Sequence, residues 1–193
     1  MIPGLTWGVR PSERTASLPC DRLCPPRGVQ ADRAISIAAP PAVVFSWLCQ
    51  LRVAPYSYDI LDNFGRRSPR LRDPELLHLE VGQRFMTIFT LRSFVGGEQI
   101  TLRSNGVAVT YAVRAEEEGS RLHVRVLFGA PRVFARVLAL GDLVMMRKQL
   151  LTLKSLAEKD YSESWNSIIA ATESNASSRA ASRAAGDGAE STA

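Results

Sequence analysis

A segment rich in tyrosine and acidic side chains, YSYDILDN from Tyr56 to Asn63, has the composition of a ligand-binding site. Tyrosine combines a ring that packs against apolar groups with a hydroxyl that can orient a bound molecule. A structural interpretation stands beside this one, in which the rings pack short helices against a sheet and the carboxylates pair with Arg66 or Arg67. The candidate ligand-binding residues of this segment are Tyr56, Tyr58, Asp59 and Asn63.

Arg147 falls on the apolar side of a predicted C-terminal helix. A guanidinium that faces an apolar cavity must find an anion or several acceptors, because it does not lose its charge. Arg147 is therefore expected to hold a carboxylate or enolate-like oxygen of a ligand in a bidentate contact. The open alternative is a structural pair with Asp142, Asp59 or Glu98, or an extended side chain that reaches the cavity rim.

Other chemistry has little support in the sequence. His78 and His123 stand alone, and Cys20, Cys24 and Cys49 have neither zinc-site spacing nor the number expected of a disulfide framework. His123 alternates with apolar residues, which puts it on the outer face of a strand and disfavours a catalytic role. Catalytic-triad and glycine-rich phosphate-binding motifs are absent. We expect no metal and no cofactor.

Composition and charge indicate an ordinary globular protein. Of the 193 residues, 46% are hydrophobic and 22% charged, and no apolar run approaches the length of about 18 residues that a membrane span requires. The first 17 residues lack the charged-then-apolar order of a signal peptide, so a cytoplasmic location is expected. The net charge is +5, and its densest cluster is the arginine loop, residues 66–72, with Arg66, Arg67, Arg70 and Arg72. This loop either binds phosphates or is a solvated loop with acidic partners nearby. Its role stays open, as do those of Cys20 and Cys24.

The element that must position Arg147 is a long amphipathic helix, predicted from about residue 132 to residue 159. At about 100° per residue, one broad arc of this helix is apolar and wide enough to pack on a whole sheet. Its members are Leu140, Leu143, Val144, Met146, Leu150, Leu151, Leu153 and Ala157. Lys148, Gln149, Thr152 and Ser155 fall on the other side, together with the exceptions Met145 and Leu156.

The preceding segments predict a sheet. Alternation of apolar and polar residues predicts strands, and Gly96-Gly97 and Asn105-Gly106 predict hairpin turns. The expected strands cover residues 34–38, 76–81, 83–94, 98–104, 107–114 and 121–128. Helical turns are expected over residues 41–51 and 58–63. Short connections predict an antiparallel meander with one face exposed to water.

The termini differ from this central part. Residues 1–30 carry five prolines, and the chain after Tyr161 consists mainly of Ser, Ala, Glu and Gly. We therefore predict a disordered or extended N-terminal tail over residues 1–17, a folded domain over 18–160 and a disordered low-complexity tail over 161–193.

The order of elements predicts an α+β fold in which a curved antiparallel sheet wraps around a long C-terminal helix. A curved sheet and a straight helix do not touch along their full length, so a cavity is expected between them. This order resembles the START-like, or helix-grip, SRPBCC superfamily, as do the blocks ISIAAPPAVVFSWLCQL and GSRLHVRV. The blocks WLCQLRVAPYSYDILDNFGRRSPR, VGQRFMTIF and GDLVMMRKQLLTLKSLAE look like one bacterial branch of that superfamily.

The resemblance implies a helix-grip fold with two short helices after the first strand, and a family of polyketide cyclase/dehydrase and lipid-transfer proteins. It implies a lipid- or polyketide-like hydrophobic ligand in the cavity. Phe89 and Tyr111, which strand alternation places on one face of their strands, join the ligand-binding candidates. Three function classes stay open: a binding or carrier module, a cyclase/dehydrase-type enzyme acting on a similar ligand, and a protein- or RNA-contacting module. In the enzyme, Tyr56, Tyr58 or Asp59 would move a proton and Arg147 would stabilise an oxyanion. The fold alone does not choose among these classes.

Overall fold

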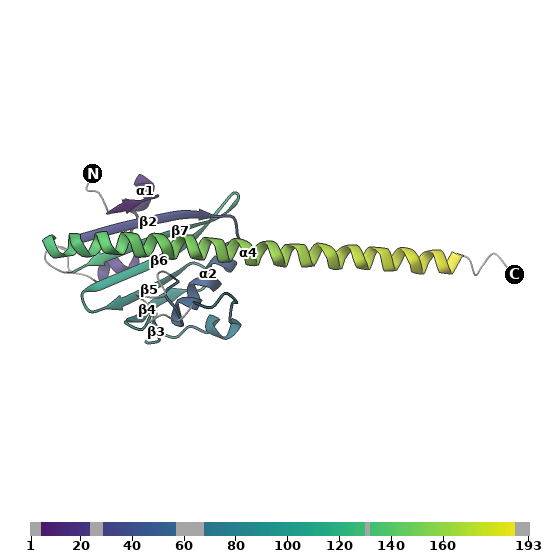
Figure 1. Cartoon of the computed structure of the whole chain (residues 1–193), viewed down its shortest axis with the longest axis horizontal. Helices are drawn as coiled ribbons and strands as arrows, with labels where there is room; N and C mark the ends of the chain where they lie inside the picture. Colours follow the sequence, from purple (N-terminus) through teal and green to yellow (C-terminus); the bar gives the residue numbers. More distant parts are fainter. Residues whose placement is uncertain (1–4, 24–28, 57–67, 130–131, 188–193) are drawn as a thin grey trace. The chain divides into compact units, whose positions relative to one another are not determined.

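One curved sheet forms the body of the protein in a computed structural model (Figure 1). The structure describes residues 5–23, 29–56, 68–129 and 132–187, and for residues 132–140 and 172–187 it describes the backbone alone. Within these ranges the sheet has seven strands in the order β1-β2-β7-β6-β5-β4-β3. Every neighbouring pair is antiparallel except β1 and β2, which run parallel at one edge. The strands are β1 (Thr6–Trp7), β2 (Val29–Ile37), β3 (Arg84–Phe85), β4 (Phe89–Val95), β5 (Gln99–Ser104), β6 (Val107–Glu116) and β7 (Gly119–Phe128).

The predicted hairpins are confirmed. Gly97 and Gly106 lie in the turns that join β4 to β5 and β5 to β6, with φ angles of 80° and 75° that favour glycine. β6 pairs with β7 from Val107 opposite Phe128 to Glu116 opposite Gly119, which fixes the face on which each side chain lies.

Short helices and one long helix complete the fold. They are α1 (Pro11–Thr15), η1 (Pro19–Arg22), α2 (Pro41–Cys49), η2 (Gln50–Arg52), η3 (Pro74–Leu77) and α4 (Arg132–Asp187), where η marks a 3₁₀ helix. As predicted, Pro41 occupies the first turn of α2, and Val44, Trp47 and Leu48 are buried. The strand expected over residues 76–81 is wrong, because Pro74 starts η3 there and Asp73 accepts a hydrogen bond from the Glu75 N–H at its beginning. The helical turn expected over 58–63 lies outside the described residues.

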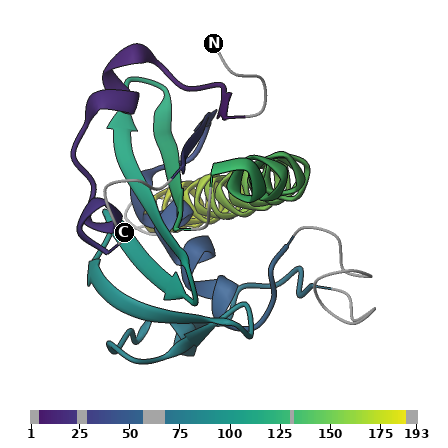
Figure 2. The same ribbon diagram turned by 90° about the vertical axis from the view of Figure 1, so that its left-hand side faces the viewer.

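The concave face of the sheet holds the first part of α4 (Figure 2). The expected class is therefore confirmed: an α+β, helix-grip arrangement with a curved open sheet, a long C-terminal helix and short helices after β2. The predicted face of α4 is partly wrong. Gln149 and Leu156 are buried, whereas Val144 and Leu151 are 54% and 43% exposed. The helix is rotated so that the arc from Asp142 through Gln149 to Leu156 faces the sheet.

The strand predicted over residues 83–94 is interrupted. β3 ends at Phe85 and β4 begins at Phe89, because Met86 and Thr87 have φ angles of 45° and 66°. Such values are rare for residues other than glycine and unusual for a β-branched side chain. The Met86 N–H donates to the carbonyl of Leu51 (2.9 Å), which ties the interruption to η2.

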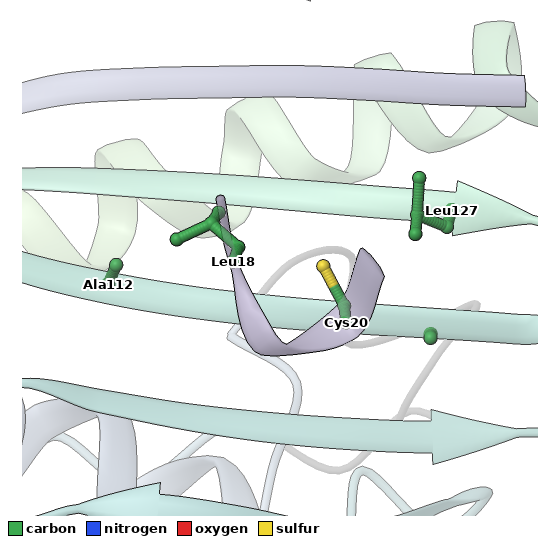
Figure 3. Packing of buried hydrophobic residues seen from close by; sticks show 5 residues of the cluster. Leu18, Cys20, Ala112 and Leu127 are labelled. Carbon is green, nitrogen blue, oxygen red and sulfur yellow. The ribbon is translucent and has the colours of Figure 1, made fainter. Parts of the chain in front are cut away.

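The convex face of the sheet carries the N-terminal segment, residues 8–23 (Figure 2). Leu18 and Cys20 pack against Ala112 of β6 and Leu127 of β7 on the face opposite α4 (Figure 3). The Cys20 N–H donates to the Thr110 hydroxyl at 3.1 Å. The wet face that the meander predicts is therefore covered here, and β1 and α1 lie within the residues expected to form the N-terminal tail.

By its contacts the chain divides into two units, residues 1–158 and 159–193. In the second unit the backbone is helical to Asp187, where the composition predicts disorder. Alanine, glutamate and arginine have high helix propensity, so a lack of core residues does not prevent a helix. Lys159 pairs with Glu163 at 3.6 Å, and the Tyr161 and Trp165 ring centroids lie 6.4 Å apart. In the described ranges, no helix combines the length and apolarity needed to cross a membrane.

Candidate functional site

A cavity of about 340 Å³ lies between α4 and the concave face of the sheet, and we call it the helix–sheet cavity. Its walls come from β4, β6, β7 and α4, from the interruption between β3 and β4, and from Pro55. Most of the lining side chains are aliphatic, aromatic or thioether groups. They are Pro55, Met86, Thr87, Ile88, Phe89, Val107, Val109, Tyr111, Val126, Asp142, Met145, Met146 and Gln149.

The α4 wall follows from helical spacing. Asp142, Met145, Met146 and Gln149 lie at positions i, i+3, i+4 and i+7, so they share one face of the helix. Val107, Val109 and Tyr111 share the inner face of β6 by the two-residue period of a strand.

Two polar groups in the wall are paired with each other. The Tyr111 hydroxyl donates to Gln149 Oε1 at 2.8 Å, and Gln149 Nε2 donates to the Pro55 carbonyl at 2.5 Å. Burial and the nearby Asp142 carboxylate raise the pKa of Tyr111, so its phenol stays neutral. These bonds link sheet, helix and loop, and they explain why a polar Gln149 faces the sheet.

Asp142 is the acid of the cavity. Its side chain is 21% exposed, and its Oδ2 lies 3.5 Å from Nη2 of the fully buried Arg33 of β2. Arg33 also donates to the carbonyls of Leu5 (2.8 Å) and Asp32 (3.0 Å). Burial raises the pKa of Asp142 to about 6, against an opposing effect of Arg33. An acid with such a pKa exchanges its proton near neutral pH.

Two predicted ligand-binding residues, Phe89 and Tyr111, do line the cavity. Tyr56 is buried beside it, with φ 56° and its ring edge-on to Trp47 at a centroid distance of 6.0 Å. It is not among the lining residues. Tyr58, Asp59 and Asn63 lie outside the described residues. Whether any of these residues binds a ligand stays a prediction.

Arg147 does not have the position expected of it. Its side chain is exposed and lies over the ring of Trp7 in β1, with 5.7 Å from Cζ to the ring centroid. The rotation of α4 turns Arg147 away from the cavity and leaves it out of the lining. A cation over an aromatic face is a favourable surface contact. The premise that its guanidinium faces an apolar cavity is therefore wrong.

Sequence reasoning missed Arg33, Asp142 and Gln149. Arg33 carried a signal, because it interrupts the apolar face that Ala31 and Ile35 share on β2. Asp142 carried one as well, as a charged residue between Leu140 and Leu143. Gln149 carried none, since a polar residue at the border of an apolar arc is normally exposed.

A polar network occupies the convex face, and we call it the outer-face network: Glu13, Asp21, Asp32, Arg121, His123 and Arg125. His123 lies on the outer face as predicted, but it is buried, with Nε2 3.0 Å from Asp32 Oδ1. Burial raises the pKa of Asp32, while hydrogen bonds from His123, Gln30 and Arg125 lower it, and the net shift is downward. With each group bonded to another, the arrangement is that of a structural network. Burial also raises the pKa of Cys20 to about 11, so its thiol is not a nucleophile near neutral pH.

Two other hollows are open and polar. One, of about 360 Å³, is lined by Arg92, Arg103 and Asn105 among others, and one of about 610 Å³ by Arg10, Lys154 and residues 116–118. Neither has the apolar wall of the helix–sheet cavity. In the described part of the arginine loop, Arg72 donates to the Ser46 hydroxyl at 2.8 Å, while Arg66 and Arg67 lie outside the described residues.

Among the described residues, no group of three His, Cys, Asp or Glu side chains is placed to hold a metal ion. The helix–sheet cavity, with its mainly apolar wall and Asp142 as an ionisable group, is the candidate functional site.

Comparison with known proteins finds similar solved structures at low sequence identity. A protein of Chromobacterium violaceum is 16% identical, over 67% of this chain and 97% of that one, with a TM-score of 0.43. A polyketide-cyclase-like protein of Corynebacterium glutamicum is 17% identical over 70% and 95% of the two chains, with a TM-score of 0.43. The di-domain ARO/CYC StfQ from the steffimycin biosynthetic pathway is 13% identical over 69% of this chain and 51% of that one, again with a TM-score of 0.43.

The solved structures that resemble this chain thus include polyketide-cyclase-like and ARO/CYC proteins. No family model matches the chain, and the search of curated proteins gave no significant match.

Proposed function

We propose that the protein binds a hydrophobic small molecule in the helix–sheet cavity, as a binding or carrier module. The observation that carries the proposal is the cavity itself, about 340 Å³ with a mainly apolar wall and a few polar groups. Ligand sites in proteins have this character and volumes of about 300–1,000 Å³. The volume is at the small end of that range. The expected ligand is therefore a compact molecule, or one end of a longer lipid- or polyketide-like molecule.

The walls are suited to holding such a molecule. Met145 and Met146 are flexible thioether side chains that adapt to different ligand shapes. The exposed Thr87 and Ile88 border the opening, where the strained backbone of Met86 and Thr87 breaks the strand. Strained backbone of this kind gathers at ligand-binding sites.

Mass spectrometry of the full chain, purified without denaturant, tests the proposal. A molecule that stays with the protein in native spectra and is released on unfolding supports it. If the native mass equals that of the bare chain and hydrophobic probes do not bind, the proposal is contradicted.

The enzyme alternative is supported by one observation, the Asp142 carboxyl, because its pKa of about 6 is suited to general acid or base catalysis. The proton would then move through Asp142. If the co-purified molecule is converted by the wild-type chain but not by Asp142→Asn, the protein is an enzyme. If it is recovered unchanged from both, the protein is a carrier.

A further inference from the structure

The Asp142 carboxyl has hydrogen-bonding capacity that the described residues do not use. Its Oδ2 atom is buried, yet it accepts no hydrogen bond from the described part of the chain. The closest cation, Arg33 Nη2, is 3.5 Å away, which is longer than the usual 2.7–3.2 Å of an N–H···O hydrogen bond. Asp142 lines the cavity, and a ligand that donates a hydrogen bond to its carboxylate from there gains affinity.

The other polar groups of the cavity have less hydrogen-bonding capacity left for a ligand. Tyr111 already donates to Gln149, whose amide donates to Pro55. Thr87 is exposed at the opening. Among the described residues of the inner wall, Asp142 is thus the polar group whose carboxylate can still accept a hydrogen bond from a ligand.

The charge presented to the cavity is negative. Arg33 is fully buried on β2 and does not line the cavity, so a ligand meets the carboxylate and not the guanidinium. Among the described residues, the titratable groups that act on Asp142 from the elements packed against it are Arg33 of β2 and the neutral Tyr111 phenol of β6. A ligand carboxylate placed here would face a like charge, whereas a hydroxyl would donate to it.

We propose that Asp142 is the specificity-determining residue of the helix–sheet cavity, and that it selects apolar ligands bearing a hydroxyl group over ligands bearing a carboxylate. This inference rests on the proposed function. It reverses the sequence-based expectation of a ligand carboxylate held by Arg147, because the group that faces the cavity is an acid.

The proposed selection should depend on pH, because Asp142 changes its protonation state in the accessible pH range. With a pKa of about 6, this carboxyl is mostly ionised at about pH 7.5 and mostly protonated at about pH 5. When protonated, it can donate to a carboxylate. Affinity for a carboxylate ligand should therefore rise on acidification, while affinity for a hydroxyl ligand changes little.

The test uses three probes with the same ring system: 2-naphthol, 2-naphthoate and 2-methylnaphthalene. Calorimetric titration of the full chain at about pH 7.5 should give at least about tenfold tighter binding of naphthol than of naphthoate, with methylnaphthalene between them. In Asp142→Asn the naphthol-to-naphthoate ratio should fall at least about fivefold, because the amide is uncharged and can donate. Asp160→Asn, the same change on α4 outside the cavity lining, should keep the wild-type ratio.

If Asp142→Asn does not fold, titrations of the wild-type chain with the same probes at several pH values test the inference instead. Naphthoate affinity should increase at least about threefold between about pH 7.5 and pH 5, a range in which naphthoate itself stays mainly ionised. Naphthoate binding that equals or exceeds naphthol binding at the higher pH would overturn the inference and leave the proposed function standing. Failure of all three probes to bind would contradict both.

Discussion

Asp32 Oδ1 accepts a hydrogen bond from Arg125 Nε at 2.8 Å on the convex face of the sheet, and both side chains are almost completely buried. The pair lies on neighbouring strands, opposite each other in register. A charged pair on the outer face of a sheet needs a cover, and the N-terminal segment supplies it. The carbonyls of Glu13, Arg14 and Ala16 accept hydrogen bonds from the same Arg125 guanidinium.

Replacing Asp32 with Asn should lower the free energy of unfolding by about 3 kcal/mol near neutral pH, because it leaves a buried guanidinium without its closest counter-ion. Since the pKa of Asp32 is lowered in the folded state, its contribution is present above the unfolded pKa of about 4 and is lost as pH falls through the folded value. The loss caused by Asp32→Asn should therefore shrink in acid. Denaturant unfolding at several pH values measures this, with Glu117→Gln in an exposed turn as the control. A loss of stability that does not depend on pH contradicts the argument.

A chain that begins at Ala16 should melt at a lower temperature than the full chain. It lacks two of the carbonyls that accept from Arg125, and it lacks the Glu13 carboxylate that pairs with Arg121 at 2.7 Å. Each lost hydrogen bond to a charged group is worth about 1.5–3 kcal/mol. A chain that ends at Asp160 is the control, and its first unit should keep its melting temperature. Equal melting of the N-terminally shortened and full chains would show that the segment is dispensable.

The buried Tyr111 hydroxyl and Gln149 should be energetically coupled. Gln149→Leu strands the hydroxyl and Tyr111→Phe strands the amide oxygen, at a cost of about 1–3 kcal/mol each. The double variant strands neither, so its loss should be smaller than the sum by about 1 kcal/mol. A double-mutant cycle by chemical denaturation measures the difference. Strictly additive losses would mean that the 2.8 Å contact contributes nothing to stability.

Arg147→Met should change stability by no more than about 1 kcal/mol, the usual worth of an exposed cation–aromatic contact. Affinity for a hydrophobic probe should stay within about twofold, because the side chain does not line the cavity. Lys148→Met, at the exposed neighbouring position, is the matched control. A loss above about 3 kcal/mol would reinstate the structural pair considered for Arg147. A tenfold loss of affinity would reinstate its role as a ligand contact.

Much of the fold could be predicted because the signals for it are local. Two-residue alternation and the Asn105-Gly106 turn are enough to place β5 and β6, because the large apolar side chains of each strand lie on one face. The phase of α4 could not be predicted in this way. Val144 and Leu151 extend its apolar arc to a side that the sheet does not cover. The sequence pattern predicts that Gln149 is exposed, because its partners Tyr111 and Pro55 are distant in the chain.

The same distinction between local and long-range signals applies to the residues of the candidate site. Phe89 and Tyr111 could be assigned to the cavity because strand alternation gives their face. The Asp142–Arg33 pair joins positions far apart in the chain and depends on the rotation of α4, which no local pattern encodes. The role of the N-terminal segment was equally hidden. Its contribution comes largely from backbone carbonyls, which have no sequence signature.

Occupancy of the helix–sheet cavity is most directly tested with a substitution that fills it. Val107 is half-buried in the cavity wall, and Val107→Trp should block the cavity while the domain stays folded. Val144→Trp makes the same change on the exposed side of α4. The measurement is a fluorescence titration with the neutral hydrophobic probe N-phenyl-1-naphthylamine, accompanied by a thermal melt of each variant. The proposed function predicts saturable binding to the wild-type chain and to Val144→Trp, and at least about tenfold weaker binding to a folded Val107→Trp. Equal binding to all three chains would place the probe elsewhere and contradict the proposed function.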